Sequence, residues 1–538
     1  MVSAARRRPG AFTLRSLSPA SWALICGSLL AGLYLIWTPL APDLAAQVAR
    51  TNVVRNAGNL AWWTGWFGGL SMPSYSLLAP ASMAIFGVRV TGVAAAVAGA
   101  WLTGKLVAQS RRPRAGAIAF AAAQIANLVD GRVTFAMGLT CAVAALVAMK
   151  SRRGFLAAIC AVAAYGASPL AAFFLGLALV ALVLVDPGRR RLALSVGGLL
   201  VAVAVVMAVL FPGSGRMPFT ITDTIPSGLC CLGVALFCPN RTVRVTVALL
   251  ACSLPIFLLV PGAVGDNVTR LAWVCSVPLV VAYAPLRREL LAVVLALLAI
   301  WPVFDLVGQL SAGRAPSSAA SFYRPLQRAI NAEQARAGPG AIGERVEVVD
   351  TSNHWASAYL GSDVSLARGW YRQADVSYNP LFYRDGALNA YSYRRWLDDL
   401  AVGWVALPSP AVPLDYSAVA EGGLVRGGLK YLTAVWSNAD WTLYRVTDAT
   451  GLAVGARATA VDASSVTLVA DSGRAVDLRM RWSPYLVVET PGGTRVDGAC
   501  IADNDGWLRV GLPAAGKYRI TGRFDPVNRV KPAQACQR

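Results

Sequence analysis

Residues 22–50 read WALICGSLLAGLYLIWTPLAPDLAAQVAR, and this stretch indicates both the class of protein and the place to look for a site. Its first part, 22–40, is apolar and close to the roughly 20 residues that cross the hydrocarbon core of a bilayer. It is too long for a signal peptide and lacks a convincing cleavage site of small residues, so we expect a retained first membrane span. Directly after it come Pro42 and Asp43, which open an amphipathic segment.

The composition of the whole chain fits a membrane protein. Of 538 residues, 56% are hydrophobic and 14% charged, and the mean hydropathy of +0.53 excludes an ordinary soluble protein. The formal net charge is +21, and residues up to Leu310 hold 24 of the 49 Lys and Arg but only seven of the 28 Asp and Glu. These basic residues lie in loops between apolar runs, which indicates membrane topology and not nucleic-acid binding.

Eleven apolar runs predict membrane-spanning helices. They are 22–40, 90–109, 116–129, 134–150, 154–168, 170–185, 192–211, 225–238, 245–260, 271–285 and 290–310. Because several are shorter than about 20 residues, the count can shift by one or two. Residues 74–87 are expected to form an outer interfacial or re-entrant helix, since a full crossing there would reverse every later loop.

One orientation places the basic connections on a single side. Eighteen of the 24 Lys and Arg up to Leu310 then face the cytoplasm, where such residues are retained. We therefore expect a multi-pass plasma-membrane protein with a cytoplasmic N-terminus, an outward first loop and an extracytoplasmic C-terminal part. The cytoplasmic clusters lie at 6–8, 111–114, 150–153, 189–191, 241–244 and 287–288.

The character of the chain changes after residue 310, where Trp, Tyr, Asp and turn residues become frequent. Short strand patterns at 346–349 and 404–407, separated by helical patterns, predict an extracytoplasmic α/β domain over 311–450. From Leu452 onward strands and turns predict a small β-sandwich, residues 451–538. The expected fold is thus a helical polytopic membrane domain, residues 1–310, followed by an extracytoplasmic α/β plus β-sandwich domain.

Cysteine placement agrees with this division. Eight of the ten cysteines lie in or near spans, where we expect them to act as small apolar side chains. Cys500 and Cys536 are the two in the extracytoplasmic part, where an oxidising exterior permits a structural disulfide.

Acidic residues are scarce before Leu310, so each one is informative. Asp186 and Glu289 adjoin cytoplasmic arginines, and charge balance explains them. The other five acids and six arginines all fall on the expected outer face, which indicates a site at the outer membrane boundary for a substrate that carries phosphate or sugar hydroxyls. These residues are Asp43, Asp130, Asp223, Asp266, Asp305, Arg50, Arg55, Arg89, Arg132, Arg216 and Arg270.

The first outer loop joins Asp43 to a tryptophan-glycine pattern, GNLAWWTGWFGG at 58–69, which is followed by PSYS at 73–76. Two interpretations are open. Asp43 can cap a helix while the tryptophans form an aromatic belt at the membrane surface. Alternatively, the loop belongs to the site.

An aspartate just after the first span, a long first loop with Trp-Gly pairs, about eleven spans and an outer C-terminal domain resemble the GT-C superfamily of polyprenyl-phosphate-sugar-dependent glycosyltransferases. The actinobacterial cell-envelope branch, which includes arabinofuranosyl- and mannosyltransferases, is closest in style. The resemblance covers the membrane half in layout and is sharpest at Pro42-Asp43 and 62–75. It implies that Asp43 is the catalytic base. Many members carry an acidic pair in this loop, whereas here no Asp or Glu follows Asp43 before Asp130, so no clear ligand set for a divalent metal is present.

Sugar transfer from a polyprenyl phosphate needs a base for the acceptor hydroxyl and cations for the departing phosphate. Arg270 and Arg132 are the candidates for donor phosphate binding, because both lie at outer span ends at headgroup depth. The alternative for each is a salt bridge to a neighbouring acid. With Asp43 as the single base, transfer would invert the anomeric centre. Candidate supporting residues are Asp130, Asp266, Asn267, Trp62, Trp63, Trp66 and Tyr75.

The α/β domain concentrates aromatic residues with Arg and Asn at 353–355, 368–372 and 378–383. Such residues stack on sugars and bond their hydroxyls, which indicates an acceptor platform, although an aromatic core with exposed arginines gives the same pattern. His354 is the only histidine in the chain, which argues against a His-dependent triad or a His-rich metal site. Candidate acceptor-binding residues are His354, Trp355, Arg368, Trp370 and Arg372.

The sequence therefore predicts a membrane glycosyltransferase that builds an envelope glycan or glycolipid at the outer face of the plasma membrane. Its expected partners are the lipid bilayer, a polyprenyl-phosphate sugar and a glycan or glycolipid acceptor. Three alternatives stay open: a transporter or flippase, a non-catalytic envelope-assembly protein, and a sugar-binding partner of another transferase. A transporter would normally show internal repeats and ionisable residues near the bilayer midplane, and the sequence shows neither.

Overall fold

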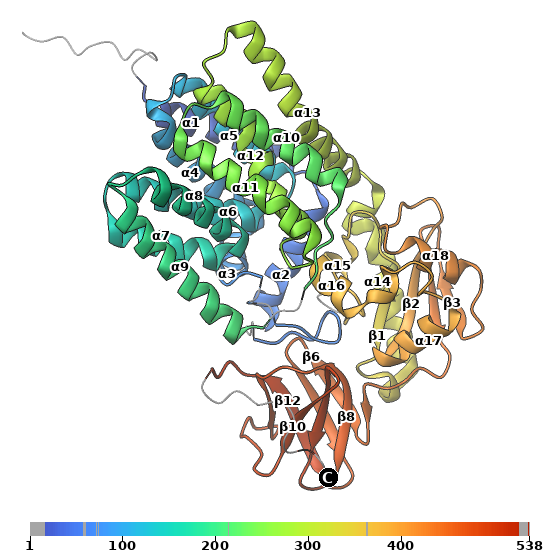
Figure 1. Cartoon of the computed structure of the whole chain (residues 1–538). Coiled ribbons are helices and arrows are strands. Elements are labelled where there is room, and N and C mark those ends of the chain that lie inside the picture. The colour runs from blue at the N-terminus through green and yellow to red at the C-terminus, as the bar shows by residue number, and fades with distance from the viewer. Residues whose placement is uncertain are drawn as a thin grey trace, which may run out of the picture.

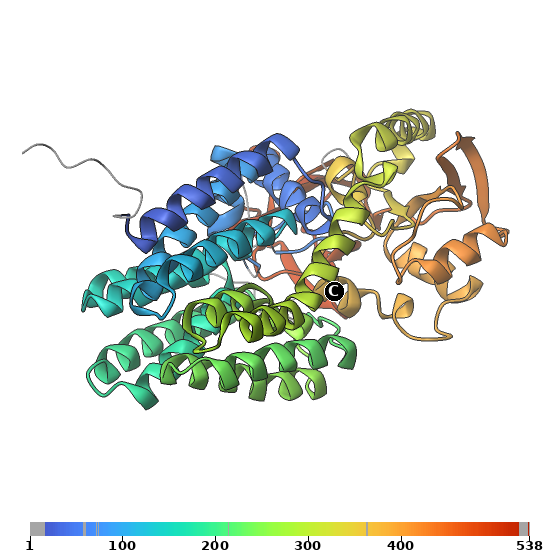
Figure 2. The same cartoon turned by 90° about the horizontal axis from the view of Figure 1, so that it is seen from above.

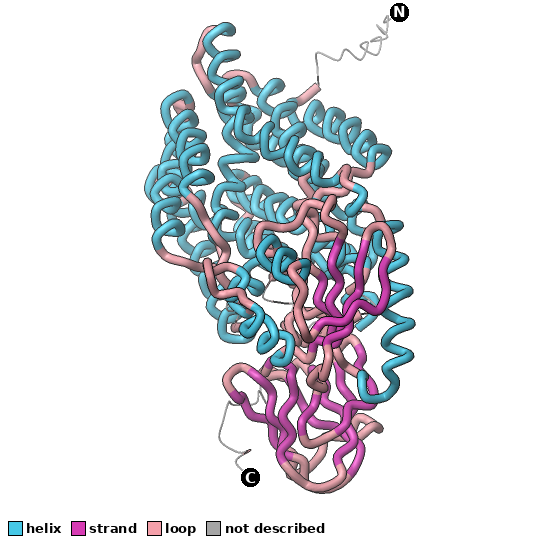
Figure 3. The backbone as a smooth tube through the Cα atoms, turned by 90° about the vertical axis from the view of Figure 1, so that its right-hand side faces the viewer, coloured by secondary structure: helices cyan, strands magenta, loops and turns pink. Residues whose placement is uncertain are grey.

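The computed structural model describes residues 17–57, 61–71, 73, 75–212, 215–361, 364–526 and 536. The basic cluster at 6–8, residues 58–60 of the first loop and Ser74 lie outside the described residues. A bundle of helices is followed by an α/β region and then by a β-rich region, which Figure 1 colours from blue through yellow to red. Figure 3 shows that the strands gather at one end of the molecule, away from most of the bundle.

Each of the eleven predicted apolar runs lies on one helix of the bundle. Six helices in the described part of the chain, α1, α4, α6, α9, α11 and α13, are long and apolar enough to cross a membrane, and α7, α8 and α10 are shorter apolar helices. The chain is thus a membrane protein, whereas eleven crossings and their orientation stay predictions. The helices are α1 (Pro19–Trp37), α4 (Val88–Leu106), α5 (Pro113–Val129), α6 (Val133–Lys150), α7 (Gly154–Ala167), α8 (Pro169–Val185), α9 (Arg190–Leu210), α10 (Ile221–Phe237), α11 (Arg241–Leu259), α12 (Arg270–Tyr283) and α13 (Arg288–Gly313).

Local sequence sets the ends of several of these helices. Ser18 caps α1 by accepting a hydrogen bond from the Ser21 amide, and Ser168 and Asn240 cap α8 and α11 in the same way. Pro19 and Pro169 occupy first-turn positions, where their missing N–H costs nothing. Large apolar side chains are exposed on the bundle surface, which suits hydrocarbon and not water.

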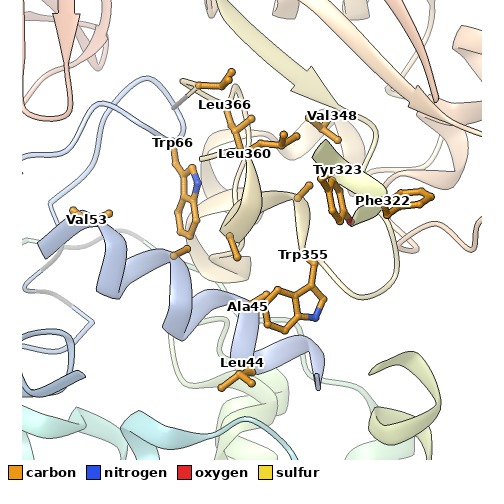
Figure 4. Packing of buried hydrophobic residues seen from close by; sticks show 14 of the residues in the cluster. Leu44, Ala45, Val53, Trp66, Phe322, Tyr323, Val348, Trp355, Leu360 and Leu366 are labelled. Atoms are coloured by element: carbon orange, nitrogen blue, oxygen red, sulfur yellow. The ribbon is translucent and has the colours of Figure 1, made fainter. Parts of the chain in front are cut away.

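Two shorter helices follow the first span. α2 (Pro42–Ala57) lies where the bundle meets the later regions, and α3 (Leu78–Phe86) occupies most of the segment expected to form an interfacial helix. Leu44, Ala45 and Val53 of α2 are buried in one core with residues of the α/β region, including Trp355 (Figure 4). This burial places the N-terminus of α2 between the bundle and the α/β region.

The α/β region is built on a mixed sheet with the strand order β1-β2-β4-β3. β1 (Arg345–Val348) and β2 (Val402–Pro408) are parallel and are connected through α15 (Ala356–Tyr359), α16 (Arg372–Tyr378) and α17 (Ala390–Asp399). β4 (Trp441–Val446) pairs antiparallel with both β2 and β3 (Leu432–Ser437). α14 (Ala320–Ala337) and α18 (Val419–Arg426) complete the region, which lies beside the end of the bundle (Figures 1 and 2).

Two four-stranded sheets with a shared core form the last region. Their orders are β10-β11-β8-β5 and β6-β7-β12-β9. Burial alternates along β8, whose Val476, Leu478 and Met480 point into the core, as expected for a sandwich. A disulfide joins Cys500 to Cys536, whose Cα atoms are 5.7 Å apart. The strands are β5 (Ala453–Val454), β6 (Arg457–Asp462), β7 (Ser465–Ala470), β8 (Ala475–Arg481), β9 (Leu486–Glu489), β10 (Cys500–Asn504), β11 (Trp507–Gly511) and β12 (Gly516–Gly522).

Residues 61–71, which we call the tryptophan loop, connect α2 to both later regions. Trp62 is buried in the core of the sandwich, where a Cβ added at Gly522 would lie 2.3 Å from its own Cβ. Trp66 is buried in the core shared with the α/β region and packs against Gly369. The tryptophans therefore hold regions together, and the expected aromatic belt at the membrane surface is not what they form.

Candidate active site

Six charged side chains gather where α2, the α5–α6 turn, the start of α12 and α13 converge. Asp43 lies in the first turn of α2, and Asp305 lies in α13, near the end of that helix that leads to the α/β region. Among the residues that the structure describes, no three His, Cys, Asp or Glu side chains are grouped so as to hold a metal ion. We call the six charged side chains the charged cluster, and its members are Asp43, Asp130, Arg132, Asp266, Arg270 and Asp305.

Asp43 contacts two arginines through a single oxygen. Arg270 Nη2 lies 3.2 Å from Asp43 Oδ2, and Arg132 Nε lies 3.6 Å from the same atom. The Asp43 side chain is 30% exposed, and Oδ2 is the oxygen nearest to both arginines. The carboxylate is therefore held by two cations at a position that solvent can reach.

Arg132 is the centre of the cluster because it pairs with three acids. Its Nη1 lies 2.6 Å from Asp130 Oδ2, and its Nη2 lies 3.3 Å from Asp305 Oδ2. The neighbour salt bridge expected for Arg132 thus exists, together with the contact to Asp43. Arg270, by contrast, pairs with Asp43 and with no other acid among the described residues.

Gly131 brings the α5–α6 turn onto the start of α2. Its φ of +82° lies in the left-handed region, and an added Cβ would lie 2.4 Å from the Leu44 amide nitrogen. The close backbone approach places Arg132 beside Asp43, so a glycine is required at this position.

Two acids of the cluster lie in the connections between helices, where Asp130 is buried and Asp266 is partly buried. Burial raises the pKa of Asp130 to about 7, although Arg132 opposes the shift, and Asp305 and Asp43 add to it. Burial raises the pKa of Asp266 to about 7 as well, against the effect of Arg270. Near neutral pH, the charge of the cluster is therefore sensitive to small changes in pH.

The remaining supporting candidates lie elsewhere. Asn267 donates a hydrogen bond to the Val264 carbonyl, 3.1 Å away, within a local turn. The ring of Tyr75 packs against the guanidinium of Arg50, 3.6 Å from the ring centroid. Trp63, like Trp62 and Trp66, is buried in the tryptophan loop and makes no described contact with the cluster.

The expected acceptor platform is a buried ion network. Arg368 donates to both oxygens of Asp375, at 3.1 and 2.6 Å, and Arg372 donates to both oxygens of Asp415, at 2.9 and 2.7 Å. His354 and Trp355 are buried with them, and Trp370 is partly exposed. Desolvated, ion-paired groups of this kind are already occupied, so we do not assign acceptor binding to this set.

An apolar cavity of about 510 Å³ lies inside the bundle. At one end it is lined by Leu271 and Ala272, the two residues that follow Arg270 in α12. At the other end it is lined by polar residues, including Lys150 and Arg189. A long, chain-like apolar ligand can therefore occupy the bundle close to Arg270.

Asp305 forms an ion pair with Arg132 that the sequence did not indicate. Scarcity marked it as one of five informative acids, but nothing in the sequence pairs it with Arg132, 173 positions away. Trp370 Nε1 donates a hydrogen bond to the Pro42 carbonyl, 3.0 Å away. This contact carries no sequence signal either, because an indole N–H bonded to a backbone carbonyl leaves no pattern.

No protein-family model matches the chain, and no curated protein matches it. Two structures of the arabinofuranosyltransferase AftD from Mycobacteria are similar to it, with TM-scores of 0.45 and 0.42 and identities of 13% and 11%, each over 94% of this chain. The arabinosyltransferase EmbB from Mycobacterium smegmatis is similar at a TM-score of 0.29 and 12% identity over 97%. The chain spans 60%, 57% and 64% of those three chains.

Proposed function

We propose that the chain is a membrane glycosyltransferase that transfers a sugar from a polyprenyl phosphate to an envelope glycan or glycolipid at the outer face of the plasma membrane. The observation that carries the proposal is the contact of two arginines with Oδ2 of Asp43, whose side chain is still 30% exposed. Base and phosphate-holding cations thus occupy one place, as the reaction requires.

In the proposed reaction, Asp43 Oδ1 accepts the proton of an acceptor hydroxyl as its oxygen attacks the anomeric carbon of the donor sugar. The bond between that carbon and the phosphate oxygen breaks, and the polyprenyl phosphate leaves as an anion. Arg270 and Arg132 hold this anion by charge-assisted hydrogen bonds. A single displacement of this kind inverts the anomeric configuration.

The cavity supports a lipid-linked donor. Its lining reaches Leu271, so a phosphate at Arg270 lies next to apolar space suited to an isoprenoid chain. A free nucleotide sugar would leave this space without a matching group.

The test is sugar transfer in membranes from a panel of polyprenyl-phosphate sugars, with the parent chain and Asp43→Asn at matched expression. Asn keeps the size of the side chain and removes the base, so transfer should fall by at least about 100-fold. The control is Asp477→Asn, which removes an exposed acid paired with Arg509 in the sandwich, away from both the cluster and the cavity. It should leave transfer unchanged.

NMR analysis of the product is a second measurement, and it should show that the anomeric configuration is inverted in the new glycosidic bond. Full activity of Asp43→Asn would remove Asp43 from the mechanism. Absence of transfer by the parent across a broad panel would favour the transporter or assembly-protein alternatives.

A further inference from the structure

Two tryptophan side chains of the α/β region hold the backbone that leads into Asp43. Trp370 Nε1 donates a hydrogen bond to the Pro42 carbonyl, 3.0 Å away, and Trp355 Nε1 donates to the Leu40 carbonyl, 3.2 Å away. Figure 4 shows the Trp355 ring beside the start of α2. The carbonyls at 40 and 42 flank the turn from α1 into α2, so the two indoles fix the residues directly before Asp43.

The Trp370 ring is itself held in place. The imidazole of His354 stacks on it, with ring centroids 3.5 Å apart and planes 15° apart. His354 Nδ1 lies 2.6 Å from Asp350 Oδ2, and its Nε2 lies 3.6 Å from Asp415 Oδ2. Asp415 also binds both terminal nitrogens of Arg372, so a buried network supports the ring from behind.

His354 has a φ of +59°, in the left-handed region that residues other than glycine rarely adopt. Such backbone strain persists only where surrounding contacts over-determine it, and it is common at functional sites. Here the strained residue is the one that stacks on Trp370. The strained backbone of His354 therefore lies next to Trp370, the side chain whose hydrogen bond reaches Pro42.

We infer that the α/β region acts on the reaction by positioning Asp43, with Trp370 and Trp355 as positioning residues. The inference rests on the proposed function. It assigns the α/β region a part in catalysis that does not depend on acceptor binding, and it explains why residues with the composition of a sugar platform are buried and ion-paired. The α/β region fixes one end of α2, and Gly131 and Arg132 fix the same end from the bundle side.

The test replaces Trp370 by Phe, which keeps an aromatic ring and removes the N–H. The matched control is Trp441→Phe, because Trp441 Nε1 donates an equivalent bond, 3.1 Å, to the Phe322 carbonyl in the same region. Each variant loses one indole–carbonyl bond, but only Trp370 reaches the Asp43 segment. We expect kcat to fall by at least about ten-fold in Trp370→Phe, with the donor KM within about two-fold of the parent. Trp441→Phe should match the parent in both.

Two further measurements separate positioning from general damage. In the Asp43→Asn background, Trp370→Phe should cause no additional loss of residual transfer, because the group being positioned is already absent. In an Asp43→Cys chain, the rate of labelling by a membrane-impermeant maleimide should change at least about three-fold with Trp370→Phe and not with Trp441→Phe.

The labelling rate does not depend on sugar transfer, so the two proposals can fail separately. If the parent shows no transfer but labelling responds to Trp370→Phe, the proposed function is wrong and the contact still positions residue 43. If Asp43→Asn abolishes transfer while Trp370→Phe equals Trp441→Phe in kcat and in labelling, the positioning inference is overturned.

Discussion

Replacing Gly131 by Ala should separate Arg132 from Asp43 without removing a charged group. The added methyl would lie 2.4 Å from the Leu44 nitrogen, whereas ordinary contact begins at 3.4 Å, so the turn and the start of α2 must move apart by about 1 Å. The left-handed φ adds a backbone cost of about 1–2 kcal/mol.

A displacement of about 1 Å at a catalytic group can lower the rate by about 100-fold, which is the loss of transfer that we expect. The control is Gly386→Ala, since Gly386 has a φ of +73° and an added Cβ there would have no neighbour within 4 Å. It carries the backbone cost alone. Gly131→Ala should unfold at a somewhat lower temperature than Gly386→Ala, because it adds the clash, but both should be folded at the assay temperature, where only Gly131→Ala loses transfer.

The assay is initial-rate sugar transfer with the donor identified by the panel, together with thermal unfolding of each purified variant. A Gly131→Ala chain that folds like Gly386→Ala and transfers at the parent rate would refute the reasoning. It would mean that the approach of the α5–α6 turn to α2 does not set the geometry of the proposed base.

Three further outcomes follow from the charges and the disulfide. Burial raises the pKa of Asp130 to about 7, so lowering the pH from 8 to 6 neutralises this acid and leaves Arg132 with one acidic partner fewer. The donor KM should therefore fall over that range. Asp130→Asn should give a low donor KM that depends less on pH. Asp415→Asn leaves the Arg372 guanidinium buried without its partner and should destabilise the α/β region by about 3–5 kcal/mol, seen as a lower unfolding temperature with earlier proteolysis at α16; unchanged unfolding would contradict the network. Cys500→Ser opens a loop of 36 residues and should cost the sandwich about 4 kcal/mol, measured by denaturant unfolding under non-reducing conditions.

The sequence predicted the elements whose signals are local. Apolar runs of near-membrane length became helices, because burial in hydrocarbon depends on composition along one segment. α2 begins at Pro42, so Asp43 lies in its first turn and not at the cap position that one interpretation of the first loop assigned to it; proline fits the first turn, and an acid favours the helix N-terminus. The acids of the charged cluster could be singled out by their scarcity, and Arg132 and Arg270 by their place at the span ends expected to face outward.

Tertiary contacts explain what the sequence did not show. Which acids Arg132 would meet depends on how the α5–α6 turn approaches α2 and α13, and no local pattern records that approach. Trp62 and Trp66 have the composition of a membrane belt, but packing into two cores uses the same residues. In the same way, His354 and Arg372 suit a sugar platform and a buried network equally well until burial is known.

The tryptophan loop also links the timing of synthesis to the geometry near Asp43. Gly68 accepts a hydrogen bond from the Arg481 amide, and Trp62 packs on Gly522, so the loop reaches its final place only after most of the chain exists. At about 5–20 residues per second, the ribosome needs on the order of half a minute or more to make the intervening residues. During that time the segment beside the proposed base waits without its partners. A message truncated shortly after the codon for Val446 would therefore yield the helices of the bundle with a first loop that has no sandwich to close on.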